Sequence, residues 1–293
     1  MKNYLYYIYW LIRTWPMRWG VPKYKILSFD ETVNEIVTNK KSISRFGDGE
    51  FHLLTKERGI FFQELNQKIA ERLYEVLNSN LPNHLVCIPF NFNSQKNLKK
   101  DAKVHWLNFL NKKGKEITAA IENPHTIFGD AMISRFYFDY KNKNEVPRRI
   151  NSLMMIWENK DVLIVEGELS RLGIGNDFFN KAKSIKRILC PSKNAFEKYD
   201  EILTATKIHG KSKLIIIAIG PTATVLAYDL AKENYWALDL GHIDIEYSWF
   251  LQNAQTKVPV KGKKSAEVSG DEDFELVSGE EEYYNASIIK HIL

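Results

Sequence analysis

The sequence predicts an α/β fold with a Rossmann-like, mostly parallel sheet that is covered by helices on both faces. Short apolar runs such as DVLIVEG (161–167) and KLIIIAIG (213–220) have the length and composition of strands buried on both faces. Segments with a helical spacing of apolar residues separate these runs, as in sheets built from strand–helix–strand units. The chain has 293 residues, 44% hydrophobic and 26% charged, enough for one large domain or two small ones.

The first half of the chain alternates predicted helices and strands. Asp30 is a plausible N-cap for a helix over 30–40. The apolar positions of 62–78 recur at helical spacing, and 95–120 is a longer polar helix with an apolar cluster. The strands predicted between these helices are SISRF (42–46) and LVCIPF (85–90).

The second half repeats this order. A glycine-rich loop, ELSRLGIGND (168–177), follows the strand at 161–167, and DFFNKAKS (177–184) is predicted to start a helix. The remaining predicted elements are a strand KRILCP (186–191), a strand and helix joined by Gly-Pro-Thr within 213–234, and a strand YWALDLG (235–241).

Four loops carry chemically marked residues, and each follows a predicted strand. They are RFGDGE (45–50), VEGELSRLGIGND (165–177), IGPT (219–222) and LGHIDIEY (240–247). Ligands of open parallel sheets bind beyond the carboxyl ends of the strands. We therefore expect the four loops to converge on one rim of the sheet.

The loop RFGDGE combines a cation, two acids and two glycines. A purely structural turn needs glycine and one acid at most, so Arg45, Gly47, Asp48 and Glu50 indicate a ligand. Arg45 and Gly47 would contact a nucleotide sugar. Asp48 or Glu50 would hold sugar hydroxyls or act as a base for an acceptor hydroxyl.

Three further segments have residues suited to an anion. In the glycine-rich loop these are Ser170, Arg171, Gly175, Asn176 and Asp177; elsewhere they are Ser134 with Arg135, and Gly220, Pro221 and Thr222 at a helix start. Each segment also has a structural alternative. The glycine-rich loop could be a plain loop, Arg135 could anchor a strand, and Gly220-Pro221-Thr222 could be an ordinary strand–helix turn. The glycine-rich loop matches neither a Walker A nor a GxGxxG pattern, which disfavours a kinase or an NAD enzyme.

The segment GHIDIEY carries His242, Asp244 and Glu246 at alternate positions. In an extended segment these side chains point the same way. Two carboxylates and an imidazole on one face suit Mg²⁺ or Mn²⁺, with a phosphate substrate completing the coordination. The alternative is a half-exposed strand whose acids are solvated.

Composition limits the kinds of partner, compartment and metal site that the chain can have. A formal charge of +5 without a basic stripe argues against nucleic acid. Cys87 and Cys190 lie in apolar runs, which indicates buried free thiols in a reducing compartment, and no cysteine motif suggests zinc.

The two ends of the chain differ in character. Residues 1–28 are aromatic and basic; the apolar run is too short to span a bilayer and lacks a signal-peptide cleavage site. Residues 1–20 therefore form either a membrane-interface helix or a helix packed on the domain. The charged segment 255–293 is either a mobile surface segment or a lid over the site.

Several motifs in order resemble the bacterial GT-D glycosyltransferases, from about residue 40 to residue 252. They are RFGDGEF, SRFYFDY, EGELSRLGIGNDFF, CPSKNAF and GPTATVLAYDLA followed by ALDLGHIDIEYSWF. The resemblance implies one α/β domain, here 29–254, that is distinct from the GT-A and GT-B folds. It also implies a UDP-glucose or UDP-galactose donor and a divalent metal, Mn²⁺ or Mg²⁺, held on the diphosphate by an Asp-X-Glu motif.

Two segments match that motif, Asp48-Gly49-Glu50 and Asp244-Ile245-Glu246. The second is preferred for the metal, because His242 is beside it and a strand precedes it; Asp48 and Glu50 are then the catalytic residues. Ser248 stands where the resemblance leads us to expect another acid.

The leading hypothesis is a cytoplasmic, metal-dependent hexosyltransferase at the inner face of the membrane. It would extend a surface polysaccharide or glycosylate an adhesin, with a glycan, glycoprotein or lipid-linked sugar as acceptor. The alternatives are a phosphohydrolase or nucleotidyltransferase that uses the same acids and arginines, and a non-catalytic nucleotide-binding partner.

Overall fold

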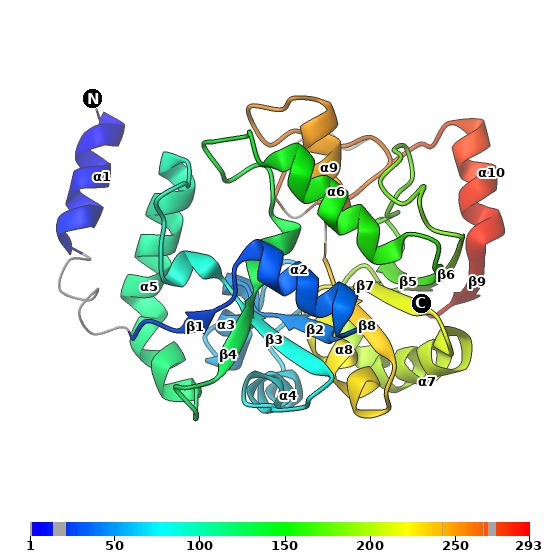
Figure 1. Ribbon diagram of the computed structural model, residues 1–293, viewed down its shortest axis with the longest axis horizontal. Helices are drawn as coiled ribbons and strands as arrows, with labels where there is room; N and C mark the ends of the chain where they lie inside the picture. The colour runs from blue at the N-terminus through cyan, green and yellow to red at the C-terminus, as the bar shows by residue number, and fades with distance from the viewer. Residues whose placement is uncertain (1, 14–21, 242, 266, 269–273) are drawn as a thin grey trace.

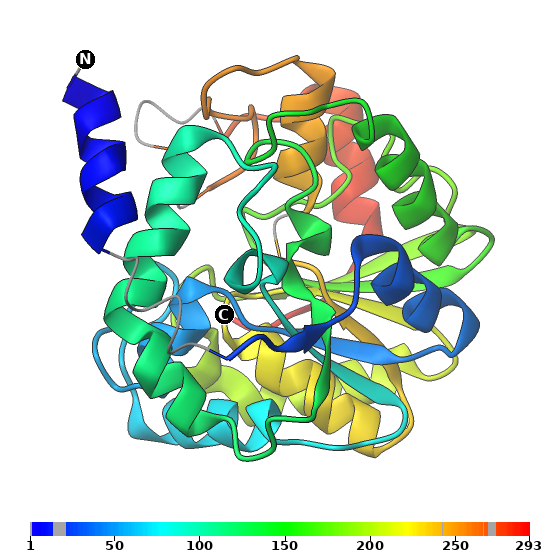
Figure 2. The ribbon, with the colours of Figure 1, turned by 60° about the vertical axis from the view of Figure 1, so that its left-hand side comes forward.

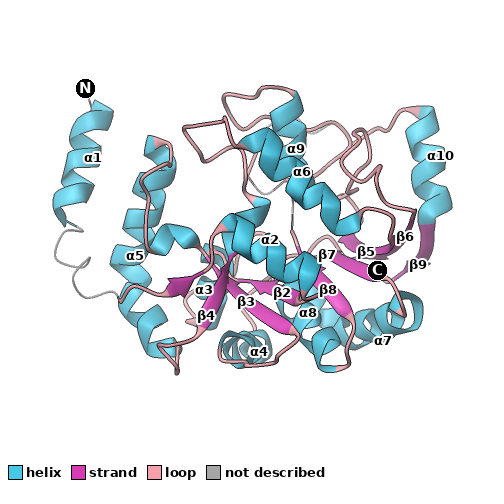
Figure 3. Ribbon diagram, in the orientation of Figure 1, coloured by secondary structure: helices cyan, strands magenta, loops and turns pink. Residues whose placement is uncertain are grey.

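The chain forms one nine-stranded sheet in the computed structural model, which describes residues 2–13, 22–241, 243–265, 267–268 and 274–293 (Figures 1 and 3). The strand order is β1-β4-β3-β2-β8-β7-β5-β6-β9, and every pairing between these strands is parallel. The strands are β1 (Lys25–Ile26), β2 (Ser42–Arg45), β3 (His84–Ile88), β4 (Ile127–Asp130), β5 (Asp161–Gly167), β6 (Ser184–Cys190), β7 (Leu214–Ala218), β8 (Trp236–Asp239) and β9 (Ile288–His291). The predicted fold class is therefore confirmed.

Helices cover both faces of this sheet. In Figure 1, α4, α8 and α7 lie below the sheet, while α2 and α6 lie above it. The helices are α1 (Lys2–Arg13), α2 (Phe29–Thr38), α3 (Asp48–Leu54), α4 (Gln67–Leu77), α5 (Lys100–Ala120), α6 (Val146–Trp157), α7 (Tyr199–Gly210), α8 (Thr222–Lys232), α9 (Ile243–Leu251) and α10 (Ser278–Ser287). None of the helices described has the length and apolar character needed to cross a bilayer.

The sheet has apolar side chains on both faces, which explains the uninterrupted apolar runs of its strands. In β5, Val162 and Ile164 join the core cluster that includes α2 and α6. Leu163 and Val165 of the same strand join the cluster that includes α7 and α8. Both cysteines are buried free thiols, as expected.

The N- and C-terminal halves of the sheet meet where β2 pairs with β8. The ladder between these strands has a single pair in register, Ile43 with Leu238. Side chains strengthen this seam: Ser42 donates to the carbonyl of Tyr235, and Arg45 binds Asp239. Helix α8 also packs against both strands. The seam therefore lies directly below the residues of the RFGDGE loop.

Several local predictions were wrong. Helix α2 is capped by Ser28, whose hydroxyl accepts from the Glu31 amide while the Glu31 carboxylate accepts from the Ser28 amide. The segment 177–183 forms turns instead of a helix, with Ser184 already in β6, and 62–66 precedes α4 instead of belonging to it. Asp48 begins a helix, so GDGE is a helix N-terminus rather than a simple loop.

The charged segment 255–293 contributes to the fold, which differs from the expectation of a mobile surface segment. Strand β9 pairs with β6 at one edge of the sheet, and α10 precedes it. The indole of Trp249 donates to the carbonyl of Val258, and the amide of Lys264 donates to the carbonyl of Leu169. These bonds fix residues 258–264 against the loops at the carboxyl ends of the strands.

Candidate active site

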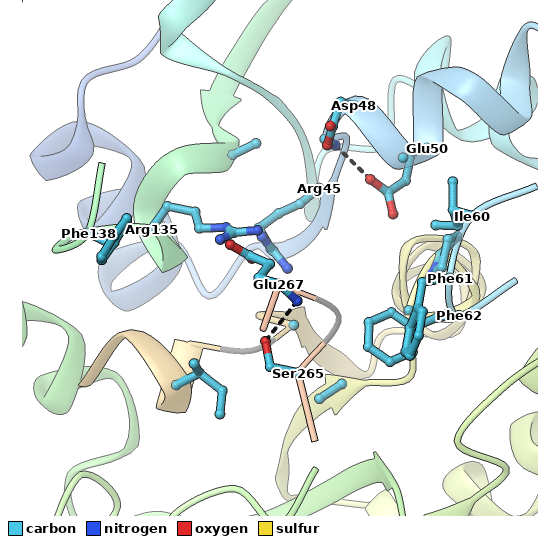
Figure 4. A pocket seen from close by; sticks show the side chains of 18 of the residues that line it. Arg45, Asp48, Glu50, Ile60, Phe61, Phe62, Arg135, Phe138, Ser265 and Glu267 are labelled. Carbon is cyan, nitrogen blue, oxygen red and sulfur yellow. Dashed lines mark hydrogen bonds and ion pairs between the residues drawn. The ribbon is translucent and has the colours of Figure 1, made fainter. Parts of the chain in front are cut away.

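A cavity of about 1020 Å³ lies at the carboxyl ends of the strands. Each of the four marked loops contributes to its lining, so the predicted convergence on one rim is confirmed. Pockets that bury a small organic ligand have volumes of roughly 300–1000 Å³, so this cavity has room for a nucleotide sugar. Figure 4 shows arginines, carboxylates and aromatic side chains directed into it.

Arg45 ends β2 and is held firmly at the floor of this cavity. Its Nε donates to the Asp239 carbonyl at 2.6 Å, and its Nη2 lies 3.0 Å from Asp239 Oδ1. Its Nη1 donates to the hydroxyl of Ser134 at 2.6 Å. Three of the five guanidinium N–H groups are thus used within the protein, and two remain for a ligand.

The acids of GDGE lie in the first turn of α3, where the helix dipole favours negative charge. One carboxylate oxygen of Glu50, Oε2, accepts from the Gly47 amide at 2.8 Å. Burial, and next the charge of Asp239, raise the pKa of Glu50 to about 7. Glu50 and Asp239 are therefore neighbouring carboxylates whose negative charges repel each other.

Asp48 faces His105 of α5, at 3.2 Å from carboxylate to imidazole. Both side chains are about half exposed, at 46% and 52%. Partial burial opposes the charge of Asp48, but the hydrogen bond and charge of His105, with Arg135 and His52, hold its pKa below the ordinary value. Asp48 is accordingly ionised and accessible from the cavity.

Arg135 follows a short 3-10 helix, Ala131–Ser134, at the end of β4. Its guanidinium forms an ion pair with Glu267 and lies 3.9 Å from Glu246. Burial opposes its charge, but these carboxylates raise its pKa. Ser134 is buried and binds Arg45, so of this predicted pair only Arg135 lines the cavity.

Asp130 fixes the start of this 3-10 helix, and its carboxylate accepts from the amides of Met132 and Phe90 at 2.9 and 3.1 Å. Burial raises the pKa of Asp130 from 3.8 to about 6. The folded protein thus holds this proton more tightly than the unfolded chain. Its contribution to the free energy of unfolding is complete below about pH 4 and is lost as the pH rises through about 6.

We therefore expect Asp130→Asn to flatten the pH dependence of stability. The amide keeps the acceptor for both N–H groups and removes the buried charge. Between about pH 4 and pH 6, wild type should lose on the order of 2 kcal/mol more unfolding free energy than the variant. Urea unfolding across this range measures the difference, and parallel curves would contradict the assignment.

The glycine-rich loop supports the site mainly from outside the cavity. Ser170 lines the cavity, but Arg171 instead donates to the carbonyls of Gly262 and Phe274 and so holds the C-terminal segment. Asn176 donates to Asp244, and Asp177 accepts from the Tyr247 hydroxyl. Gly175 is exposed, with α10 nearby.

Asp244 and Glu246 lie in α9, so the expectation of an extended segment was wrong. Positions two apart on a helix point in different directions. Asp244 is buried and accepts from the Gly173 amide, from Asn176 and from Lys263. One oxygen of Glu246 accepts from the amides of Tyr137 and Phe138, and the other is buried and has no hydrogen bond to the residues that the structure describes. His242 lies outside the described residues.

The turn at Gly220-Pro221-Thr222 has the predicted form. Gly220 has φ +60°, and a Cβ at this position would lie 3.1 Å from the Phe62 side chain. Gly220 and Pro221 line the cavity, and α8 begins at Thr222. The Thr222 side chain is buried, and its hydroxyl has no hydrogen-bond partner within the described part of the chain. The turn thus brings a helix N-terminus to the cavity wall.

Other residues of the cavity were not predicted. Asp239 is the last residue of an apolar strand. Because ligands bind at the carboxyl ends of such strands, its position in the sequence could have indicated a place at the site, as it did for the four loops. His105 and Phe62 lie in the segments predicted as helices over 95–120 and 62–78, and Phe61 comes just before the latter. Gln255, Thr256, Lys257, Lys264, Ser265 and Glu267 come from the C-terminal segment. This placement agrees with the alternative that the segment 255–293 covers the site, although no periodicity or motif indicates which of its residues reach the cavity.

These features define a class of protein: an α/β fold with a large cavity where loops that carry charged residues meet. The glycosyltransferase GT-D fold family model matches residues 43–268, which is most of the chain. The chain therefore belongs to this family of glycosyltransferases.

Individual relatives agree with this assignment. The probable glycosyl transferase Gly of Streptococcus gordonii is 37% identical over 268 residues, covering 91% of this chain and 39% of that protein. The glycosyltransferase GlyD of Streptococcus pneumoniae is 35% identical over 277 residues, covering 92% of this chain and 33% of that protein. The chain thus spans little more than a third of the length of these curated relatives.

Solved structures match over nearly their whole length. One, described as a domain of unknown function 1792 with a distinct glycosyltransferase fold, has a TM-score of 0.89 and 39% identity, covering 96% of this chain and 100% of that one. A second, described as a new glycosyltransferase from Streptococcus sanguinis, has a TM-score of 0.85 and 36% identity, covering 92% of this chain and 100% of that one.

Proposed function

We propose that this glycosyltransferase moves glucose or galactose from a UDP-sugar to a glycan, glycoprotein or lipid-linked sugar on the cytoplasmic side of the membrane. The observation that carries the proposal is the cavity itself, which places arginines and carboxylates around a volume that fits a nucleotide sugar. A sugar diphosphate needs cationic groups at its phosphates and acceptor oxygens at its hydroxyls, and this cavity has both.

Asp48 and Glu50 are also two positions apart on a helix, so their spacing is no better than that of Asp244 and Glu246. Asp48 and Glu50 nevertheless fit a divalent cation better, because of what surrounds each pair. At the second pair, Lys263 already neutralises Asp244, and Glu246 points toward a different element. At the first pair, both acids line the cavity and Asp48 is accessible. Burial, and next the charge of Asp239, raise the pKa of Glu50, and a cation would relieve the repulsion between the two carboxylates.

Within the described residues, no group of three histidines, cysteines or acids is arranged to hold a metal ion. Two carboxylates are nevertheless sufficient when a substrate diphosphate supplies further oxygens, as is usual for Mg²⁺. The bound cation would neutralise charge on the diphosphate as the bond to the sugar breaks.

The chain's own residues perform the remaining tasks in this proposal. Arg135 binds a diphosphate oxygen, and the UDP-sugar competes with Glu267 for this guanidinium. The unused N–H groups of Arg45 bind a second oxygen, and Asp239 fixes the orientation of that guanidinium. Phe61 and Phe62 give an apolar wall on another side of the cavity, suited to a sugar or base ring (Figure 4).

The test is release of UDP from a panel of UDP-sugars, with and without Mn²⁺, in the presence of a mixed glycan acceptor pool. We expect release from one hexose donor, dependent on the metal and on the acceptor. Phosphate release from simple nucleotides, with no UDP-sugar consumed, would contradict the transferase and favour a phosphohydrolase. Tight UDP binding without turnover would contradict the proposed transfer reaction.

A further inference from the structure

Between Asn3 and Arg13, helix α1 has only aliphatic and aromatic residues, and the described part of the chain covers one side of it. Trp10 is buried, and the helix packs against α5 (Figure 2). On the other side, Leu5, Tyr9 and Ile12 are 62%, 49% and 68% exposed, and Tyr6 beside them is 53% exposed. A helix that is apolar all round normally has both sides covered.

The charge near this exposed side is basic. The first 29 residues contain no aspartate or glutamate. Arg13, in the last turn of α1, donates to the hydroxyl of Tyr9 and lies over its ring. A positive charge therefore lies next to the exposed Tyr9 side chain.

A group of lysines lies next to the helix, at residues 96–103 and 139–143, which we call the lysine corner. The first segment has four lysines and one aspartate, and the second has two lysines and one aspartate. Two backbone hydrogen bonds join the segments, from Lys99 to Asp139 and from Lys141 to Asn97. Lys100 connects the corner to α1, because its amino group lies 5.9 Å from the ring centre of Tyr7.

The lysines of this corner repel one another. Burial and the charge of Lys99 lower the pKa of Lys143 to about 8, and burial and Lys141 lower the pKa of Lys103. An anionic surface would relieve this repulsion. Tyrosine, tryptophan, arginine and lysine beside exposed aliphatic residues are also the side chains favoured at the boundary between lipid and water.

We propose that the exposed face of α1, with the lysine corner, docks this enzyme on an anionic lipid surface. The helix lies along the surface and does not cross it, since twelve residues at about 1.5 Å each reach about 18 Å against about 30 Å for the hydrocarbon layer. Lys99, Ala102 and His105 of this region line the cavity, so docking brings the cavity mouth close to the lipid headgroups. An acceptor held in the membrane would then be within reach.

The test is sedimentation of the full chain with two kinds of vesicle: phosphatidylcholine alone, and an equal mixture of phosphatidylcholine and phosphatidylglycerol. We expect binding to the mixed vesicles and a loss of binding as salt is raised. The triple variant Leu5→Ser, Tyr9→Ser, Ile12→Ser should bind the mixed vesicles more than about tenfold more weakly. Reversing the charge of the exposed lysines, with Lys96→Glu and Lys141→Glu, should also weaken binding.

A control triple variant, Met155→Ser, Ile208→Ser, Val277→Ser, removes similarly exposed apolar side chains on other elements and should bind as wild type does. Equal binding to both vesicle types would overturn the assignment to an anionic surface. Unchanged binding of the α1 variant would overturn the role of the helix. A dimer that the α1 variant abolishes, without vesicle binding by wild type, would overturn the proposal and assign the face to a second copy. The assay needs no turnover, so its outcome is independent of the proposed donor and acceptor.

Discussion

Asp48→Asn is expected to lower the metal-dependent rate of UDP-sugar consumption by about 100- to 1000-fold. The reason is that the amide keeps the shape of the side chain but removes one of the two charges proposed to hold the cation. Because Asp48 is about half exposed, the variant should keep its thermal stability. The measurement is the initial rate of UDP release as a function of Mn²⁺ concentration, with the melting temperature recorded in parallel.

Asp101→Asn is the matched control, because Asp101 is also an exposed carboxylate of the cavity lining but belongs to α5, one turn before His105, and not to GDGE. It should retain most of the wild-type rate. Asp244→Asn should instead lower stability, because it leaves Lys263 buried opposite an amide. A normal metal dependence in Asp48→Asn, together with its loss in Asp244→Asn at a temperature where both fold, would move the cation to α9.

Arg187→Met is expected to lower the free energy of unfolding by about 3–5 kcal/mol. Arg187 and Glu166 are both fully buried, and Nη1 lies 2.5 Å from Oε1. The same guanidinium donates to the Leu172 carbonyl, while Glu166 accepts from the Leu172 amide. Removing the cation leaves a buried carboxylate without its partner, and it also releases the loop that carries Ser170.

The double variant Arg187→Met, Glu166→Gln should be more stable than Arg187→Met alone, because it contains no uncompensated buried charge. Urea unfolding of wild type, both single variants and the double variant gives the coupling energy. A single variant that unfolds at the wild-type urea concentration would show that water or another group solvates Glu166. Additive effects of the two changes would show that the pair is not coupled.

The sheet was predictable because its strands are marked by local composition. The run 161–167 contains no charged residue between Asp161 and Glu166, and it forms β5 over the predicted residues. The turn at Gly220 and Pro221 was likewise predictable, since its conformation is set by those two residues. Where neighbours along the chain decide the structure, sequence reasoning succeeded.

The site was predicted less completely because its contacts join distant parts of the chain. Alternating apolar and acidic residues at 243–246 match a strand, yet burial of Ile243 and Ile245 together with Asp244 is satisfied within a helix. What makes that burial possible is Lys263, which reaches Asp244 from the C-terminal segment. Likewise, Arg171 binds carbonyl groups about 91 and 103 positions away instead of a phosphate.

The position of β8 determines the order in which the fold can be assembled. Arg45 binds Asp239, 194 positions later in the chain, across the seam between β2 and β8. During synthesis, β2 therefore has an unpaired edge until the segment that forms β8 leaves the ribosome. Long-range pairing of this kind slows folding, so the nascent chain depends on protection of that edge for most of its synthesis. Deleting β8 should leave two half-sheets that aggregate rather than a smaller folded enzyme.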